Sequence, residues 1–90
     1  MPRYIVERTF PNGLNIPVNA EGAAGVRQVI ANNATAGVTW VHSYVSADKK
    51  KTFCVYDGPS PEAIVSVAVT NGLPVDGVHE VSVLDPYFYL

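Results

Sequence analysis

The pattern of hydrophobic and polar positions is clearest between residues 38 and 57. Two runs in which apolar and polar residues alternate, 38–46 and 52–57, flank a short charged turn at 47–51. Alternation with a period of two is typical of β-strands, and the short turn predicts that the two strands form a hairpin. Two further segments, 3–10 and 77–84, predict a first and a last strand, because each mixes strand-forming residues with polar ones and stops at a proline-containing turn.

Two segments between the strands predict helices. Residues 19–33 contain no proline and carry a narrow apolar stripe with a helical spacing. Residues 61–71 follow Ser60, which suits an N-cap, and stop at Gly72, which suits the end of a helix. The run 64–69 is rich in β-branched residues and resembles a strand, but these start and stop signals favour a helix.

The order of these elements predicts the fold. Strand, helix, strand, strand, helix, strand is the ferredoxin-like arrangement of the α+β class. Right-handed crossovers place the strands in the order 4-1-3-2 and put both helices on one face of the sheet. The 90 residues have the size of a single domain, residues 1–90. The other face of the sheet is then open unless a second subunit covers it.

The alternation also predicts which side chains occupy each face, because neighbouring residues of a strand point to opposite sides. The residues expected to face the helices are Tyr4, Val6, Val41, Val45, Phe53, Val55, His79, Val81 and Val83. The residues expected on the open face are Ile5, Glu7, Thr9, Trp40, His42, Tyr44, Thr52, Cys54, Tyr56, Glu80 and Ser82. Same-face residues on neighbouring strands have Cβ atoms about 4.5–5.5 Å apart, so Glu7, Cys54 and His42 should form a row of carboxylate, thiol and imidazole.

Composition and charge exclude several classes of partner. Six Lys and Arg against eight Asp and Glu provide too little positive charge to hold a phosphate backbone, so we expect no nucleic acid partner. No run approaches the roughly 18 apolar residues of a membrane span, so we expect no membrane partner. A single cysteine and a charged segment 1–10 predict a cytoplasmic location. An open face with Trp40, Tyr44 and Tyr56 is too apolar for a monomer and predicts a homodimer packed sheet to sheet.

Several segments together resemble a known family. They are Tyr4, Val6-Glu7-Arg8, Pro11, the run WVHSYVS, the strand FCVY, the Pro-Glu pair of the second helix and GLPVDGVHEV. They are similar to the small bacterial proteins described as nickel-responsive or nickel-binding, formerly a domain of unknown function. The resemblance covers nearly the whole chain, and it implies a ferredoxin-like homodimer that binds metal through Glu7, His42, Tyr44 and Cys54. The chain departs from the family in its Gly- and Ala-rich first helix and in the turn Lys49–Lys51.

Three functions follow from these observations as alternatives. The first is binding of nickel or another divalent transition metal, since thiolate, imidazole and carboxylate suit nickel, zinc and copper. The second is a cofactor-free dimeric α+β barrel enzyme, monooxygenase- or isomerase-like, with His42 as base and Tyr44 as proton donor; this alternative rests on analogy of fold. The third is an interaction module without chemistry. The aromatic segment 86–90 is expected to pack on its own chain or on a partner chain.

Overall fold

Four antiparallel strands form one sheet in the order β2-β3-β1-β4. The computed structural model describes residues 1–16 and 18–89. Its strands are β1 (Arg3–Thr9), β2 (Thr39–Val45), β3 (Lys51–Asp57) and β4 (Gly77–Val81). This order is the predicted one read from the other edge, and the predicted ferredoxin-like α+β fold is confirmed.

The two helices begin and end close to the predicted residues. In α1 (Ala20–Thr35) the side chain of Asn19 caps the first turn, and in α2 (Pro61–Asn71) that of Ser60 does the same. Gly72 ends α2 in the left-handed conformation, at a φ of 67°, which glycine adopts without steric cost. Neither helix in the described part of the chain is long and apolar enough to cross a membrane.

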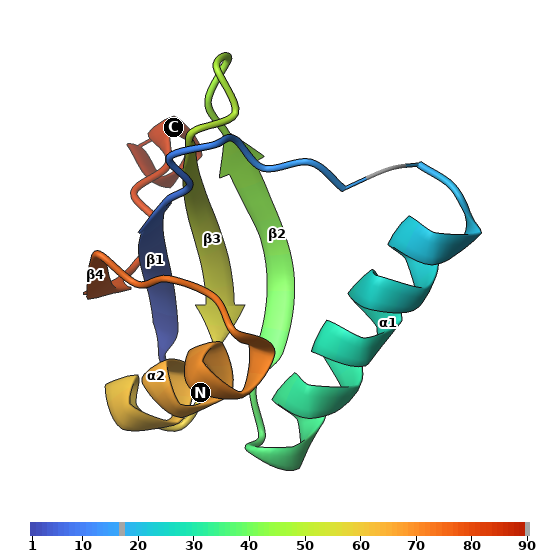
Figure 1. Cartoon of the computed structure of the whole chain (residues 1–90). Coiled ribbons are helices and arrows are strands. Elements are labelled where there is room, and N and C mark those ends of the chain that lie inside the picture. The colour runs from blue at the N-terminus through green and yellow to red at the C-terminus, as the bar shows by residue number, and fades with distance from the viewer. Residues whose placement is uncertain (17, 90) are drawn as a thin grey trace.

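The helices cover the sheet unequally. Figure 1 shows α2 in front of the sheet and α1 standing off beside β2. The core lies between α2 and the sheet, and its buried members are Tyr4, Val6, Val38, Cys54, Tyr56, Ile64 and Val67. By contrast, the residues that α1 buries are Gly22 and Asn33. The first helix is therefore held mainly by contacts other than an apolar face.

A set of asparagines ties the C-terminal half of α1 to α2. The Asn32 Nδ2 donates to Asn71 Oδ1 at 2.7 Å, and Asn71 Nδ2 donates to Asn33 Oδ1 at 3.1 Å. These bonds fix one end of α1 close to α2. Toward its N-terminus the helix diverges from the sheet (Figure 1), and a cavity of about 630 Å³ lies between them.

The predicted faces of β3 are wrong. Cys54 pairs with Val6 of β1, and Tyr56 pairs with Tyr4, so Thr52, Cys54 and Tyr56 all face the helices. Phe53 and Val55 consequently face the open side. Both sides of β3 are apolar enough to be buried, so alternation alone does not distinguish them. The partner strand β1 does, because its buried residues fix the side on which their neighbours lie.

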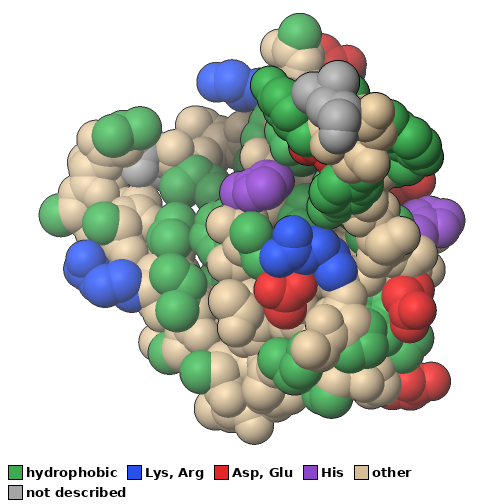
Figure 2. Space-filling view, turned by 180° about the vertical axis from the view of Figure 1, so that it is seen from behind, with side chains coloured by type: hydrophobic (Ala, Val, Ile, Leu, Met, Phe, Trp, Pro, Cys, Tyr) green, Lys and Arg blue, Asp and Glu red, His purple; other side chains and the backbone are tan. Residues whose placement is uncertain are grey.

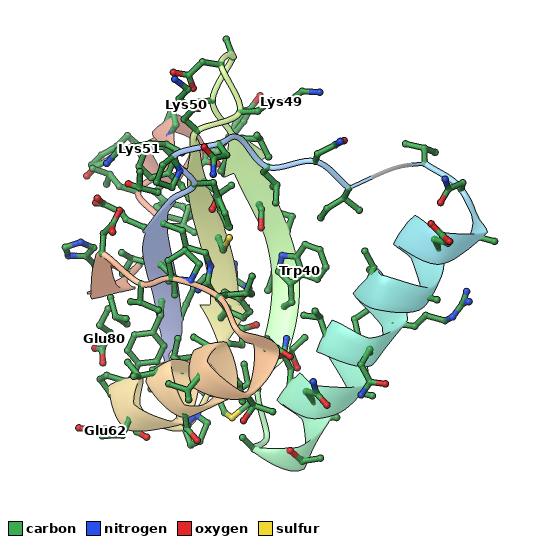
Figure 3. All side chains as sticks on the ribbon, viewed as in Figure 1. Trp40, Lys49, Lys50, Lys51, Glu62 and Glu80 are labelled. Carbon is green, nitrogen blue, oxygen red and sulfur yellow. The ribbon has the colours of Figure 1, made fainter. Side chains whose placement is uncertain are left out.

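A β-bulge separates the two halves of β2. Trp40 pairs with Tyr56 and His42 with the neighbouring Val55, which leaves Val41 as an extra residue. His42 and Tyr44 lie on the open face as predicted, whereas Trp40 lies on the helix-facing side and points toward α1 (Figure 3). Its Nε1 donates to Ser43 Oγ at 2.8 Å. The bulge re-aims the tryptophan, which is a common effect of such an insertion.

The last strand is shorter than predicted, and its faces are exchanged. Glu80 pairs with Tyr4 on the helix-facing side, so His79 and Val81 lie on the open face. Val83 and Ser82 follow the end of β4. The chain then forms a short 3-10 helix at Pro86–Tyr89 with exposed aromatic side chains, and Leu90, part of the predicted C-terminal segment, lies outside the described residues.

Candidate functional site

The open face of the sheet carries two rows of side chains that cross all four strands. From β4 to β2, the rows are His79, Ile5, Val55 and His42, and then Gly77, Glu7, Phe53 and Tyr44. His79 and the pair His42 and Tyr44 stand on the edge strands β4 and β2, Glu7 stands on the central strand β1, and the other members of the central strands are the apolar Ile5, Val55 and Phe53. Figure 2 views the molecule from the side opposite that of Figure 1 and shows hydrophobic, histidine and charged surfaces next to one another.

Glu7 and His79 form a close pair at one side of the open face. The Nε2 atom of His79 lies 3.3 Å from Oε1 of Glu7, and both side chains are partly exposed, at 57% and 37%. Gly77 makes room for this imidazole, because a Cβ at residue 77 would lie 3.1 Å from His79 Nε2. The strand pairing and one glycine thus place an imidazole nitrogen and a carboxylate oxygen beside each other, within reach of solvent.

His42 and Tyr44 form a second pair on the edge strand β2. Their rings meet edge to face, with centroids 5.1 Å apart and an angle of 83° between the planes. Both side chains are exposed. Strand β3 lies between β2 and β1, so about 10 Å separates this pair from Glu7 at the usual strand spacing. That distance is too long for one metal ion to be held by both pairs of a single chain.

Cys54 lies on the other side of the sheet. It is 7% exposed, and its Sγ contacts Thr52 Oγ1 at 3.5 Å. The expected row of Glu7, Cys54 and His42 is therefore not formed, because the prediction placed β3 the wrong way round. Within residues 1–16 and 18–89, no three His, Cys, Asp or Glu side chains come together in a way that could hold a metal ion.

His79 is the ionisable residue of this face that was expected on the helix side. Alternation of apolar residues in segment 77–84 favoured Val81 and Val83 for the core and so assigned His79 to the helix side. Pairing between strands would have placed His79 on the open face. Strand β4 is antiparallel to β1, and His79 stands opposite Ile5. Ile5 was correctly assigned to the open face.

An ion pair closes one end of the open face. Arg3 donates from Nε to Asp57 Oδ1 at 2.8 Å and from Nη2 to Oδ2 at 3.1 Å, which is the two-pronged geometry of a strong pair. The hydrogen bond and the charge of Arg3 hold the pKa of the Asp57 carboxyl below its usual value. Asp57 is thus engaged by its own chain, whereas His42 and the Glu7–His79 pair are accessible to solvent.

Comparison with known proteins identifies relatives of this fold. The profile of the family described as "Nickel responsive protein SCO4226-like" matches residues 4–81. A solved structure, described as the crystal structure analysis of SCO4226 from Streptomyces coelicolor A3(2), has a TM-score of 0.71 and 18% sequence identity, and the match covers 92% of this chain and 99% of that one. No curated protein matches. Since the profile spans most of its length, the chain belongs to the nickel-responsive SCO4226-like family.

Proposed function

We propose that the protein binds nickel, or a related divalent transition metal, as a homodimer through the open face of its sheet. The observation that supports this most directly is the Glu7–His79 pair, with 3.3 Å between the carboxylate oxygen and the imidazole nitrogen. Imidazole and carboxylate are donors that bind nickel and its neighbours in the first transition series. The name of the family is consistent with such a metal.

The number of donors supports the involvement of a second chain. One described chain offers two separate pairs, Glu7–His79 and His42–Tyr44, and no cluster of three ligating side chains. A face-to-face dimer brings a second open face within reach, so that donors of both copies surround one ion. In this proposal Glu7 and His79 bind the metal, and His42 and Tyr44 of the other copy complete or border the site. Cys54 is not part of it, because its thiol is buried across the sheet.

Exposed apolar side chains on the open face also support the proposed dimer. Ile5 and Phe53 are partly exposed there, and Tyr44 is 62% exposed. The apolar surface of the open face is smaller than the sequence suggested, because Trp40 and Tyr56 lie on the helix-facing side. A free thiol at Cys54 suits a reducing compartment, and we propose a cytoplasmic location. The enzyme hypothesis for His42 and Tyr44 gains no support from the comparisons.

Calorimetric titration with nickel tests the assignment of the donors. Glu7→Gln and His79→Ala should each weaken nickel binding at least about tenfold, because each removes one direct ligand. Gly77→Ala should weaken it without removing any donor, because the new methyl group displaces the His79 ring. Cys54→Ser is the matched control and should bind nickel as the wild type does. Wild-type affinity in the Glu7 and His79 variants, or a loss in Cys54→Ser, would refute the assignment.

A further inference from the structure

The cavity between α1 and the sheet contains a buried arginine that forms no ion pair with any carboxylate of the described residues. Arg8 lines this cavity of about 630 Å³, and the residue is 2% exposed. Its Nη1 donates to the carbonyl oxygen of Pro74 at 2.7 Å, and its Nη2 donates to the hydroxyl of Tyr56 at 3.2 Å. Its Nε is buried and has no hydrogen-bond partner within residues 1–16 and 18–89. Among the described residues, no carboxylate forms an ion pair with it.

A buried charge without a counter-ion is costly, and an unpaired buried N–H adds to that cost. Arg3, on the open face of the same strand, shows how a guanidinium of this chain binds a carboxylate. There the edge of the guanidinium formed by Nε and Nη2 binds both oxygens of Asp57. In Arg8, Nη2 donates to the Tyr56 hydroxyl, and Nε has no partner among the described residues. An incoming carboxylate can take the place of that hydroxyl and pair with Nε as well.

The rest of the cavity is suited to an apolar group. On α1, Gly22, Gly25, Val26 and Val29 line it at helical spacing, and Trp40 lines it from β2. Val26 and Val29 are only partly covered, so this stripe lacks a well-packed neighbour. The acidic residue among the described lining is Glu21, which is exposed in the first turn of the helix. The volume is within the range of small-molecule sites, about 300–1,000 Å³.

We propose that this cavity binds an amphipathic monocarboxylate, with its carboxylate on the Nε–Nη2 edge of Arg8 and its hydrocarbon chain between α1 and Trp40. Charge complementarity selects an anion, and the lining selects an apolar body. The occupant also gives Val26 and Val29 a surface on which to pack. This site is separate from the metal site proposed above, because it lies on the helix-facing side of the sheet and Glu7 and His79 lie on the other.

Octanoate and its neutral analogue octanamide test the proposal by calorimetry on the full chain. The wild type should bind octanoate at least tenfold more tightly than octanamide, because only the carboxylate compensates the charge of Arg8. Arg8→Met should reduce octanoate binding to the level of octanamide. Equal binding of the two ligands by the wild type, no detectable octanoate binding, or unchanged octanoate binding in Arg8→Met would overturn the proposal.

A second variant keeps the test decisive if Arg8→Met does not fold. In Gly25→Phe, the new side chain starts where no other atom lies within 4 Å of the added Cβ, and it fills the cavity from an exposed position of α1. This variant should lose octanoate binding while it keeps the wild-type circular dichroism spectrum. Glu7→Gln, on the opposite face, is the control and should bind octanoate normally. A folded Gly25→Phe that binds octanoate like the wild type would also overturn the proposal.

Discussion

At the scale of single residues, several side chains on the helix-facing side of the sheet carry polar groups and are almost completely buried. Tyr56 is 3% exposed and Tyr4 is 2% exposed. Burial is the main cause that raises the pKa of the Tyr56 phenol, and the nearby Arg8 opposes the rise only in part. Burial and the Glu80 carboxylate together raise the pKa of Tyr4. The neutral form of both phenols is therefore favoured in the folded chain.

This shift predicts a loss of stability in alkaline solution. In the unfolded chain a tyrosine ionises near 10.0, below its value in the folded chain, so proton release favours unfolding. The stabilisation that comes from the raised tyrosine pKa is fully present below the pKa of the unfolded chain. It is lost as the pH rises through the pKa of the folded chain. Urea unfolding at a series of alkaline pH values should show this decline, and Tyr56→Phe should make it shallower. Tyr87→Phe, in the exposed C-terminal segment, controls for the loss of a hydroxyl at the surface. An equal decline in wild type and Tyr56→Phe would contradict the prediction.

At the scale of the helices and strands, local signals were enough to locate most elements. Ser60 and Gly72 marked both ends of α2, and the structure uses them as caps. The faces of the strands needed information that one strand does not contain. In β3, residues on both sides are apolar, and in β2 an extra residue at Val41 reverses the alternation after Trp40. A period of two predicts a face only when one side is polar and the strand is regular.

The difficulty of assigning strand faces also explains which residues of the candidate site were predicted correctly and which were not. His42, Tyr44 and Glu7 were placed on the open face, and the strand pairing places them there. Cys54 was assigned to that face because the apolar pair Phe53 and Val55 was assigned to the core. His79 was missed for the corresponding reason, since Val81 and Val83 were assigned to the core in the last strand. Pairing between strands carries this information, and here the buried residues of the central strand β1 supply the reference for both neighbours.

Two glycines provide a prediction at the scale of the helices. Gly25 lies inside α1 with space around its added Cβ, so Gly25→Ala should stabilise the fold by about 1 kcal/mol through helix propensity. Gly72 has a φ of 67° at the end of α2, so Gly72→Ala should destabilise it by about 1–2 kcal/mol through backbone strain. Equilibrium urea unfolding measures both. A change of the same sign in the two variants would show that backbone conformation does not decide these effects.

At the scale of the whole molecule, the two faces of the sheet present different chemistry. The helix-facing side has Arg8 and an apolar cavity, and the open face has two donor pairs around an apolar middle. If open faces meet in a dimer, Phe53→Arg on that face should favour monomers, because it places a charge in the contact. Val69→Arg, at an exposed position of α2, is the matched control and should leave the oligomeric state unchanged. Sedimentation velocity at micromolar concentration distinguishes these outcomes.

The last prediction couples the metal to the dimer. The described residues of one chain bring no three ligands together, so a site completed by a second copy must bind nickel more tightly in the dimer than in the monomer. By linkage, nickel must then favour the dimer to the same extent. Sedimentation of a dilution series should show dimers persisting to at least about tenfold lower protein concentration with nickel than with a chelator. The double variant Glu7→Gln/His79→Ala should lose this dependence. If dilute monomers bind nickel as tightly as concentrated dimers do, the metal site belongs to a single chain, and the proposed sharing of ligands is wrong.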